Sequence, residues 1–167
     1  MEGPDEVRRR LLTEHDEVLR DQLESFAGKV EVNLRVLYDE AALMRQILRE
    51  GPEIARLREA LQGQPEDATY FERIRLGEMV ARAVEQTREA DAQSIVNALA
   101  PVAVSISVGE PAHERIALSA SFLVEQRRLD TFDQLLDQVA VQRADRMRFK
   151  YTGPLPPHSF VELAGSA

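Results

Sequence analysis

Hydrophobic and polar residues alternate along four short segments of the chain, and this two-residue period is typical of β-strands with one buried face. In the first segment, from Lys29 to Tyr38, apolar side chains occupy every second position, and Glu31, Asn33 and Arg35 fall between them. The other segments span residues 102–108, 116–124 and 147–151. The sequence therefore predicts four strands, each with one apolar and one polar face.

Between the strands, apolar residues recur at the three- and four-residue spacing of amphipathic helices. Asp39 is placed to cap one helix, and Asp130 or Thr131 another. The longest helix would span roughly 45 Å at the α-helical rise of about 1.5 Å per residue, so we expect it to bend or to project beyond the sheet. The predicted helices cover residues 4–27, 40–50, 52–61, 69–99 and 131–139.

After the first helix, the elements follow the order β-α-β-β-α-β, with several helical pieces in the first crossover. This order predicts an α+β protein with a ferredoxin-like, four-stranded antiparallel sheet and helices mainly on one face. We expect a leading helix in residues 1–28 and the ferredoxin-like domain in residues 29–167. The last strand should lie at a sheet edge beside the first, with the prolines just beyond it preventing further pairing.

The polar face of this sheet is predicted to have small hydroxyl residues at its centre and mixed charges toward one edge. It lacks the aromatic side chains that an RNA-binding sheet uses for base stacking. Either the face is hydrated, or the helix at 4–27, another domain or a partner covers it; we expect it to be covered. Its predicted members are Glu31, Asn33, Arg35, Ser105, Ser107, Ser119, Ser121, Arg148 and Lys150.

Composition narrows the classes of function. The 167 residues carry a net charge of −8, which disfavours nucleic acid or an anionic membrane surface as the main partner. The chain has no cysteine, as is common in a reducing cytoplasm. The acidic N-terminus does not resemble a signal peptide, and the nearly apolar run from Ile95 to Val108 is too short and polar to cross a bilayer. We expect a soluble, cytoplasmic protein that does not bind nucleic acid or membranes.

Candidate catalytic and metal-binding groups are few. His15, Asp16 and Glu17 are neighbours on a predicted helix, so their side chains point in different directions. His113 lies in a hairpin connection without a second histidine nearby. Asp130, Asp133 and Asp137 could line one side of a predicted helix, and the first two suit its start, because acidic side chains favour a helix N-terminus. Because common catalytic motifs are also missing, we expect no enzyme activity, cofactor or metal.

The segment that follows the last strand, Tyr151-Thr-Gly-Pro-Leu-Pro-Pro-His-Ser-Phe160, is rich in proline. It is either a polyproline ligand for an aromatic groove elsewhere or a clamp that folds back on its own domain. We favour the clamp, with Phe160 and Val161 as apolar anchors and Gly153 in a backbone shape that only glycine adopts easily. We expect all X–Pro bonds in the segment to be trans.

This segment also carries a family resemblance. Phe122-Leu-Val124, a helix led by Phe132, and a strand that ends in Thr-Gly-Pro-x-Pro-Pro-x-Ser-Phe-Val resemble the C-terminal region of the gas vesicle synthesis (GvpL/GvpF) family. The family motif usually reads Gly-Pro-Trp-Pro-Pro-Tyr-Ser-Phe, and here Leu155 and His158 replace the tryptophan and the tyrosine. Upstream, Gly28-Lys-Val-Glu31 resembles the stretch that opens the second half of family members, so the resemblance spans most of residues 7–162. Family members are usually longer, which implies that this chain corresponds to their C-terminal domain with its leading helix.

The resemblance implies a gas vesicle accessory protein that acts in vesicle assembly in the cytoplasm. Its implied partners are the gas vesicle shell protein and other accessory proteins. The alternative is a small-molecule-binding regulatory domain, which should have an enclosed pocket instead of a broad surface patch. An exposed sheet face or a projecting helix would also permit a homo-oligomer. The partner-binding candidates are Arg35, Arg148, Lys150, Gly153, Pro154, Pro156, Pro157, His158 and Phe160.

Overall fold

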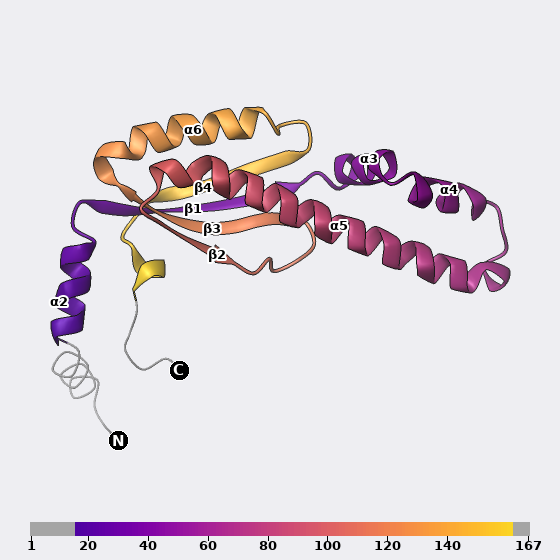
Figure 1. Ribbon diagram of the computed structural model, residues 1–167, viewed down its shortest axis with the longest axis horizontal. Coiled ribbons are helices and arrows are strands. Elements are labelled where there is room, and N and C mark those ends of the chain that lie inside the picture. The colour runs from indigo at the N-terminus through magenta and orange to yellow at the C-terminus, as the bar shows by residue number, and fades with distance from the viewer. Residues whose placement is uncertain (1–15, 162–167) are drawn as a thin grey trace, which may run out of the picture.

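The computed structural model describes residues 16–161, and its centre is a four-stranded antiparallel sheet (Figure 1). The strands lie in the order β2-β3-β1-β4, so β2 and β4 form the two margins. This order confirms the predicted ferredoxin-like α+β architecture, with the last strand at an edge beside the first. The strands are β1 (Lys29–Tyr38), β2 (Ser105–Gly109), β3 (Ile116–Glu125) and β4 (Met147–Leu155).

Two of the helices, α5 and α6, lie on one face of the sheet, and α2 extends from its end (Figure 1). None of the residues of α2 is buried, and Gly28, with φ +69°, ends the turn between α2 and β1 as predicted. The predicted leading helix began at residue 4, and its residues 4–15 lie outside the described part of the chain. The α-helices are α2 (Asp16–Ser25), α3 (Glu40–Glu50), α4 (Pro52–Ala60), α5 (Tyr70–Leu99) and α6 (Leu129–Val141).

The core lies between the sheet and these two helices, because the apolar positions of the alternating strands all face that layer. Val32, Val36 and Phe122 are fully buried. Phe122 packs against Phe132 of α6, with ring centroids 5.3 Å apart. The Leu, Val, Ile and Phe side chains of this layer supply the burial that stabilises the fold, since apolar area removed from water is the main favourable term in folding.

The long helix α5 projects beyond the sheet, as its length predicts. Its C-terminal part packs on the sheet, where Ile95 and Leu99 are fully buried. Its N-terminal part extends past the sheet together with α3 and α4 and forms a helical arm (Figure 1). Asp39 caps α3 as predicted: its side chain accepts a hydrogen bond of 2.9 Å from the backbone N–H of Ala42.

A buried polar cluster joins the base of this arm to the sheet. Arg146, just before β4, donates two hydrogen bonds of 2.6 Å to the two carboxylate oxygens of Asp91 in α5. Tyr38, at the end of β1, donates a third bond of 2.7 Å to Asp91. Burial, together with the bond to Asp91, raises the pKa of Tyr38 far above its ordinary value. The cluster therefore fixes α5 to two strands through one carboxylate.

Two predicted element starts were wrong. The second strand begins at Ser105 and not at residue 102, because Ala100–Val102 forms a 3₁₀ turn, η2, that buries Val102 in the core. Helix α6 begins at Leu129, after a 3₁₀ turn η3 (Gln126–Arg128), and has no side-chain cap from Asp130 or Thr131.

The end of β4 also differs from the prediction. The strand continues through Pro154 to Leu155, and the Gly153–Pro154 peptide bond is cis, not trans as expected. The prolines nevertheless protect this margin, since Pro154 has no backbone N–H to offer to a further strand. The exposed charges of Arg148 and Lys150 have the same effect.

Candidate functional site

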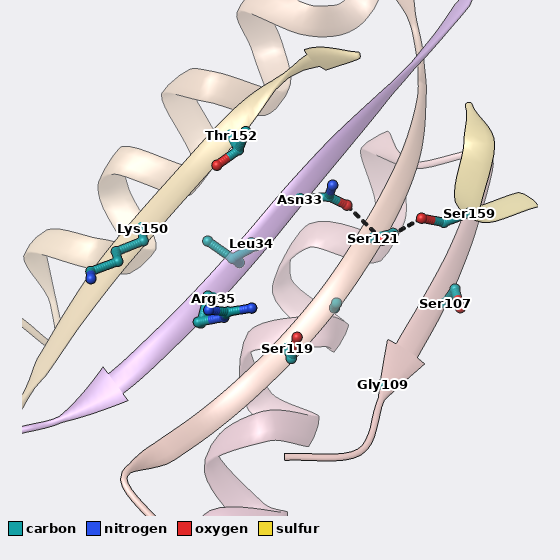
Figure 2. A pocket seen from close by; sticks show the side chains of 11 residues that line it. Asn33, Leu34, Arg35, Ser107, Gly109, Ser119, Ser121, Lys150, Thr152 and Ser159 are labelled. Carbon is teal, nitrogen blue, oxygen red and sulfur yellow. Dashed lines mark hydrogen bonds between the residues drawn. The ribbon is translucent and has the colours of Figure 1, made fainter. Parts of the chain in front are cut away.

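The polar face of the sheet, on the side away from α5 and α6, brings together two of the predicted partner-binding residues, Arg35 and Lys150, with the small polar side chains predicted for this face. The strand register aligns their Cα atoms in two rows that cross all four strands. Figure 2 shows this face, with Arg35 and Lys150 on neighbouring strands. The rows are Ser107–Ser121–Asn33–Thr152 and Gly109–Ser119–Arg35–Lys150.

Because most side chains in these rows are small, they leave a cavity of about 480 Å³ above the sheet, which we call the polar cavity. Ser119 and Ser121 form part of its floor, and Arg35 and Lys150 stand on one side (Figure 2). Both cations are exposed, and neither forms an ion pair or a side-chain hydrogen bond within residues 16–161. The cavity is thus locally basic, although the chain as a whole carries a net charge of −8.

The C-terminal tail covers one end of this face. Its 3₁₀ turn η4 (His158–Phe160) lies near Ser107 of β2 (Figure 2). From there Ser159 donates two hydrogen bonds to the carboxylate of Glu31 in β1, from its backbone N–H at 2.8 Å and from its hydroxyl at 2.6 Å. The His158 Nδ1 atom lies 3.4 Å from the same carboxylate. Glu31 is fully buried as a result. The clamp that the sequence suggested is therefore present, and the tail covers part of the polar face.

The anchor of this clamp is polar, which the sequence did not suggest. Ser159 also lies within 3.3 Å of the Ser121 hydroxyl, which itself donates to Asn33 at 2.6 Å (Figure 2). Phe160 is half-buried, but Val161 is 45% exposed, so the expected apolar anchor at Val161 is wrong. No pattern in the sequence links Glu31 to Ser159, since 128 positions separate them.

Gly153 allows the tail to reach this position. A Cβ atom on Gly153 would lie 3.0 Å from the backbone oxygen of Glu31 and 3.3 Å from the Cα atom of Val32, both closer than ordinary contacts. Here the register between β1 and β4 shifts, and Leu155 pairs with Glu31 beyond the shift. The glycine therefore lets β4 continue along β1 and deliver the tail to the polar face.

The remaining candidates do not line the polar cavity. Arg148 lies farther along β4, opposite Leu37 of β1, and is exposed. In the proline segment, Pro154 and Pro156 are exposed, and Pro157 is half-buried before the turn η4. These prolines position the tail, whereas Arg35 and Lys150 border the cavity itself.

Other candidate chemistry is dispersed. His15 lies outside the described residues, and among those described no group of three His, Cys, Asp or Glu side chains could hold a metal ion. Asp133 of α6 faces Tyr151 of β4, and burial, together with this carboxylate, raises the pKa of Tyr151 to about 12.

None of the helices within residues 16–161 combines the length and the apolar character that a bilayer crossing requires.

Comparison with known proteins places this fold among gas vesicle proteins. The family model described as gas vesicle synthesis protein GvpL/GvpF matches residues 1–162. The chain is 36% identical over 152 residues to gas vesicle protein F of Streptomyces sp. (strain CB03234), covering 91% of this chain and 63% of that relative. It is 22% identical over 157 residues to gas vesicle protein F of Dolichospermum flosaquae, covering 94% of this chain and 63% of the relative. The chain thus spans less than two thirds of the length of these relatives.

Solved structures agree on the fold. The crystal structure of GvpF from Anabaena sp. PCC7120 superposes with a TM-score of 0.83 at 20% identity, covering 98% of this chain and 66% of that one. The crystal structure of GvpF from Microcystis aeruginosa gives a TM-score of 0.74 at 19% identity, with the same coverage of 98% and 66%. The family match over nearly the whole chain and the shared fold lead to one conclusion. This chain belongs to the gas vesicle synthesis protein GvpL/GvpF family.

Proposed function

We propose that this chain acts in gas vesicle assembly as a non-catalytic accessory protein that binds the shell protein and other accessory proteins in the cytoplasm. Its family and its 36% identity to a gas vesicle protein F support a role at gas vesicles. Such a role requires a surface that other proteins recognise. The polar face of the sheet is the surface that best meets this requirement.

The observation that carries the proposal is the pair of unpaired cations beside the polar cavity. Arg35 and Lys150 lie opposite each other on β1 and β4, so their positive charges act on the same space. A guanidinium binds a carboxylate through two parallel hydrogen bonds, and the hydroxyls of Ser119 and Thr152 can donate or accept. The chemistry of the cavity therefore suits a partner segment that carries Asp or Glu side chains.

The alternative is a small-molecule-binding regulatory domain. The cavity volume of about 480 Å³ falls within the usual range for ligand sites, about 300–1,000 Å³. Ligand sites are usually enclosed and mostly apolar. This cavity is open to solvent, and most of its lining residues carry hydroxyl, amide or charged side chains (Figure 2). These properties favour a protein segment as the occupant.

Charge reversal tests the proposal. Immobilised shell protein is titrated with the wild-type chain and with the variant R35E/K150E in an interferometry or plasmon-resonance assay. We expect the variant to lose roughly tenfold or more in affinity, about 1.4 kcal/mol. The matched control is R56E/R58E on α4, because both arginines are exposed, form no ion pair within residues 16–161, and change the net charge by the same amount.

The outcomes separate the polar face from a general effect of charge. Equal affinity of R35E/K150E and the wild type would contradict the proposal. An equal loss in R56E/R58E would show that the shell protein responds to net charge and not to this face. Arg148 lies outside the cavity, so R148E should weaken binding less than K150E does.

A further inference from the structure

The strand β2 forms an open margin of the sheet. Within residues 16–161, β3 is its only neighbouring strand, so its outer edge offers unpaired backbone N–H and C=O groups. Four of its five residues are exposed and the fifth, Ile106, is half-buried. Figure 1 shows β2 at the lower margin of the sheet, and Figure 2 shows Ser107 and Gly109 on this outermost strand. Such an edge is a template for pairing with another strand.

This margin is short, at five residues, and Ser159 and Phe160 line a pocket with its first residues, but it lacks the charges, prolines and bulges that commonly protect an edge strand. Proteins block exposed edges with lysine or other charges, with proline, or with bulges. The β2 strand has no proline, and no charged residue occurs from Ala92 to Gly109. Its apolar side is incompletely covered, since Val108 is 57% exposed. The opposite margin, β4, carries Lys150 and Pro154.

The sequence of β2 is self-complementary. Its five residues, Ser105-Ile-Ser-Val-Gly109, alternate between small polar and branched apolar side chains. In an antiparallel pair centred on Ser107, Ile106 of one copy faces Val108 of the other, and Ser107 faces Ser107. Apolar side chains then meet apolar ones on one face, and small hydroxyls meet on the other. Cross-strand pairs of this kind stabilise a sheet, and no like charges are opposed.

We propose that two copies of this chain pair through β2, antiparallel and about a twofold axis at Ser107, to form one continuous sheet across both copies. This pairing is independent of the proposed partner of the polar cavity. The twofold axis is perpendicular to the sheet, because residues directly opposite in an antiparallel pair point to the same side. The two polar cavities therefore face the same direction in the dimer.

The first test is the mass of the chain in solution, measured by sedimentation equilibrium over a range of concentrations. Near 0.15 M salt the charge repulsion between copies is screened beyond about 8 Å. We expect the wild type to approach twice 18.8 kDa as concentration rises. V108K places a charge against Ile106 of the other copy and should remain at the mass of one chain. The control V141K adds the same charge at an exposed valine at the end of α6 and should behave as the wild type.

The second test fixes the register and does not depend on a disruptive substitution. The chain has no cysteine, so an introduced thiol can form a disulfide only between copies. S107C places two thiols opposite each other at the twofold axis and should give a covalent dimer on oxidation. S119C lies on the neighbouring strand β3 and should not, unless the two polar faces stack against each other.

Several results would overturn the proposal. A wild type that stays at one chain mass at all concentrations would show that β2 is covered by its own chain or remains free. A dimer that V108K leaves intact, or that S119C traps and S107C does not, would place the interface elsewhere. Dimerisation that needs an added partner protein would identify β2 as a docking edge for that partner and not for a second copy.

Discussion

The buried cluster at the base of the helical arm provides the sharpest test of what stabilises this fold. We consider the substitution Asp91→Asn, which keeps the size of the side chain but removes its charge. In the wild type, the Asp91 carboxylate accepts two bonds of 2.6 Å from Arg146 and one of 2.7 Å from Tyr38. The amide can accept through its oxygen only, and its nitrogen would face the donors of Arg146.

The expected loss of stability in D91N follows from how deeply the ion pair of Arg146 and Asp91 is buried. Removing one partner of a buried ion pair costs about 3–5 kcal/mol, because the remaining charge is left uncompensated. Here the side chain of Arg146 is 22% exposed and that of Asp91 11%, so water still solvates part of the guanidinium. We therefore expect D91N to lower the free energy of unfolding by about 2–3 kcal/mol. For a chain of this size the loss corresponds to roughly 4–12 °C in Tm.

The measurement is urea-induced unfolding followed by far-UV circular dichroism, with Tm from a thermal scan as a second reading. The control D137N removes an exposed carboxylate from α6 that has no ion pair within residues 16–161. It should change stability by less than about 0.5 kcal/mol. The double variant Y38F/D91N should cost less than the sum of the single variants, because both remove the same hydrogen bond. A loss below about 1 kcal/mol for D91N, or strict additivity in this cycle, would refute the reasoning.

Two further predictions concern the tail and the core. Gly153→Ala should destabilise the chain by about 1–3 kcal/mol in the same unfolding assay, because its Cβ would lie 3.0 Å from the backbone oxygen of Glu31. Gly77→Ala is the contrasting control, because nothing lies within 4 Å of its added Cβ. It should stabilise α5 by about 0.5–1 kcal/mol. Equal changes in stability for the two variants would exclude the steric explanation. Phe132→Ala removes a fully buried ring that packs on Phe122 and should cost about 3–5 kcal/mol; a loss below about 1 kcal/mol would mean that this layer repacks easily.

Most of the sheet could be predicted from the sequence, because alternation of apolar and polar residues reports directly which side of a strand is buried. The bounds of β1 matched the prediction, since polar and apolar residues alternate without interruption from Lys29 to Val36. The prediction from alternation was wrong at Val102, which fits the two-residue period of the strand but belongs to a 3₁₀ turn that packs into the core. It also failed beyond Tyr151, where proline and glycine suggested the end of a strand that in fact continues.

The site was predictable only in part, for a physical reason. The pattern places Glu31, Arg35 and Lys150 on one face, but it contains no information about what covers each of them. Glu31 is buried because Ser159, distant in sequence, saturates its carboxylate, whereas Arg35 remains exposed four residues away. Asp91 illustrates the same limit. From the sequence, a single carboxylate in a helix of 30 residues is expected to be exposed to solvent, because its partners Tyr38 and Arg146 are distant in the chain.

The unequal margins of the sheet restrict the size that an assembly of this chain can reach. A molecule with two free strand edges could add neighbours indefinitely and grow into a fibre. Here the β4 side is closed by the proline-containing end of the strand, and a symmetric contact at β2 would consume the remaining edge of both molecules. Growth through backbone pairing would therefore stop at two, which keeps an exposed, uncharged strand from becoming a seed for aggregation.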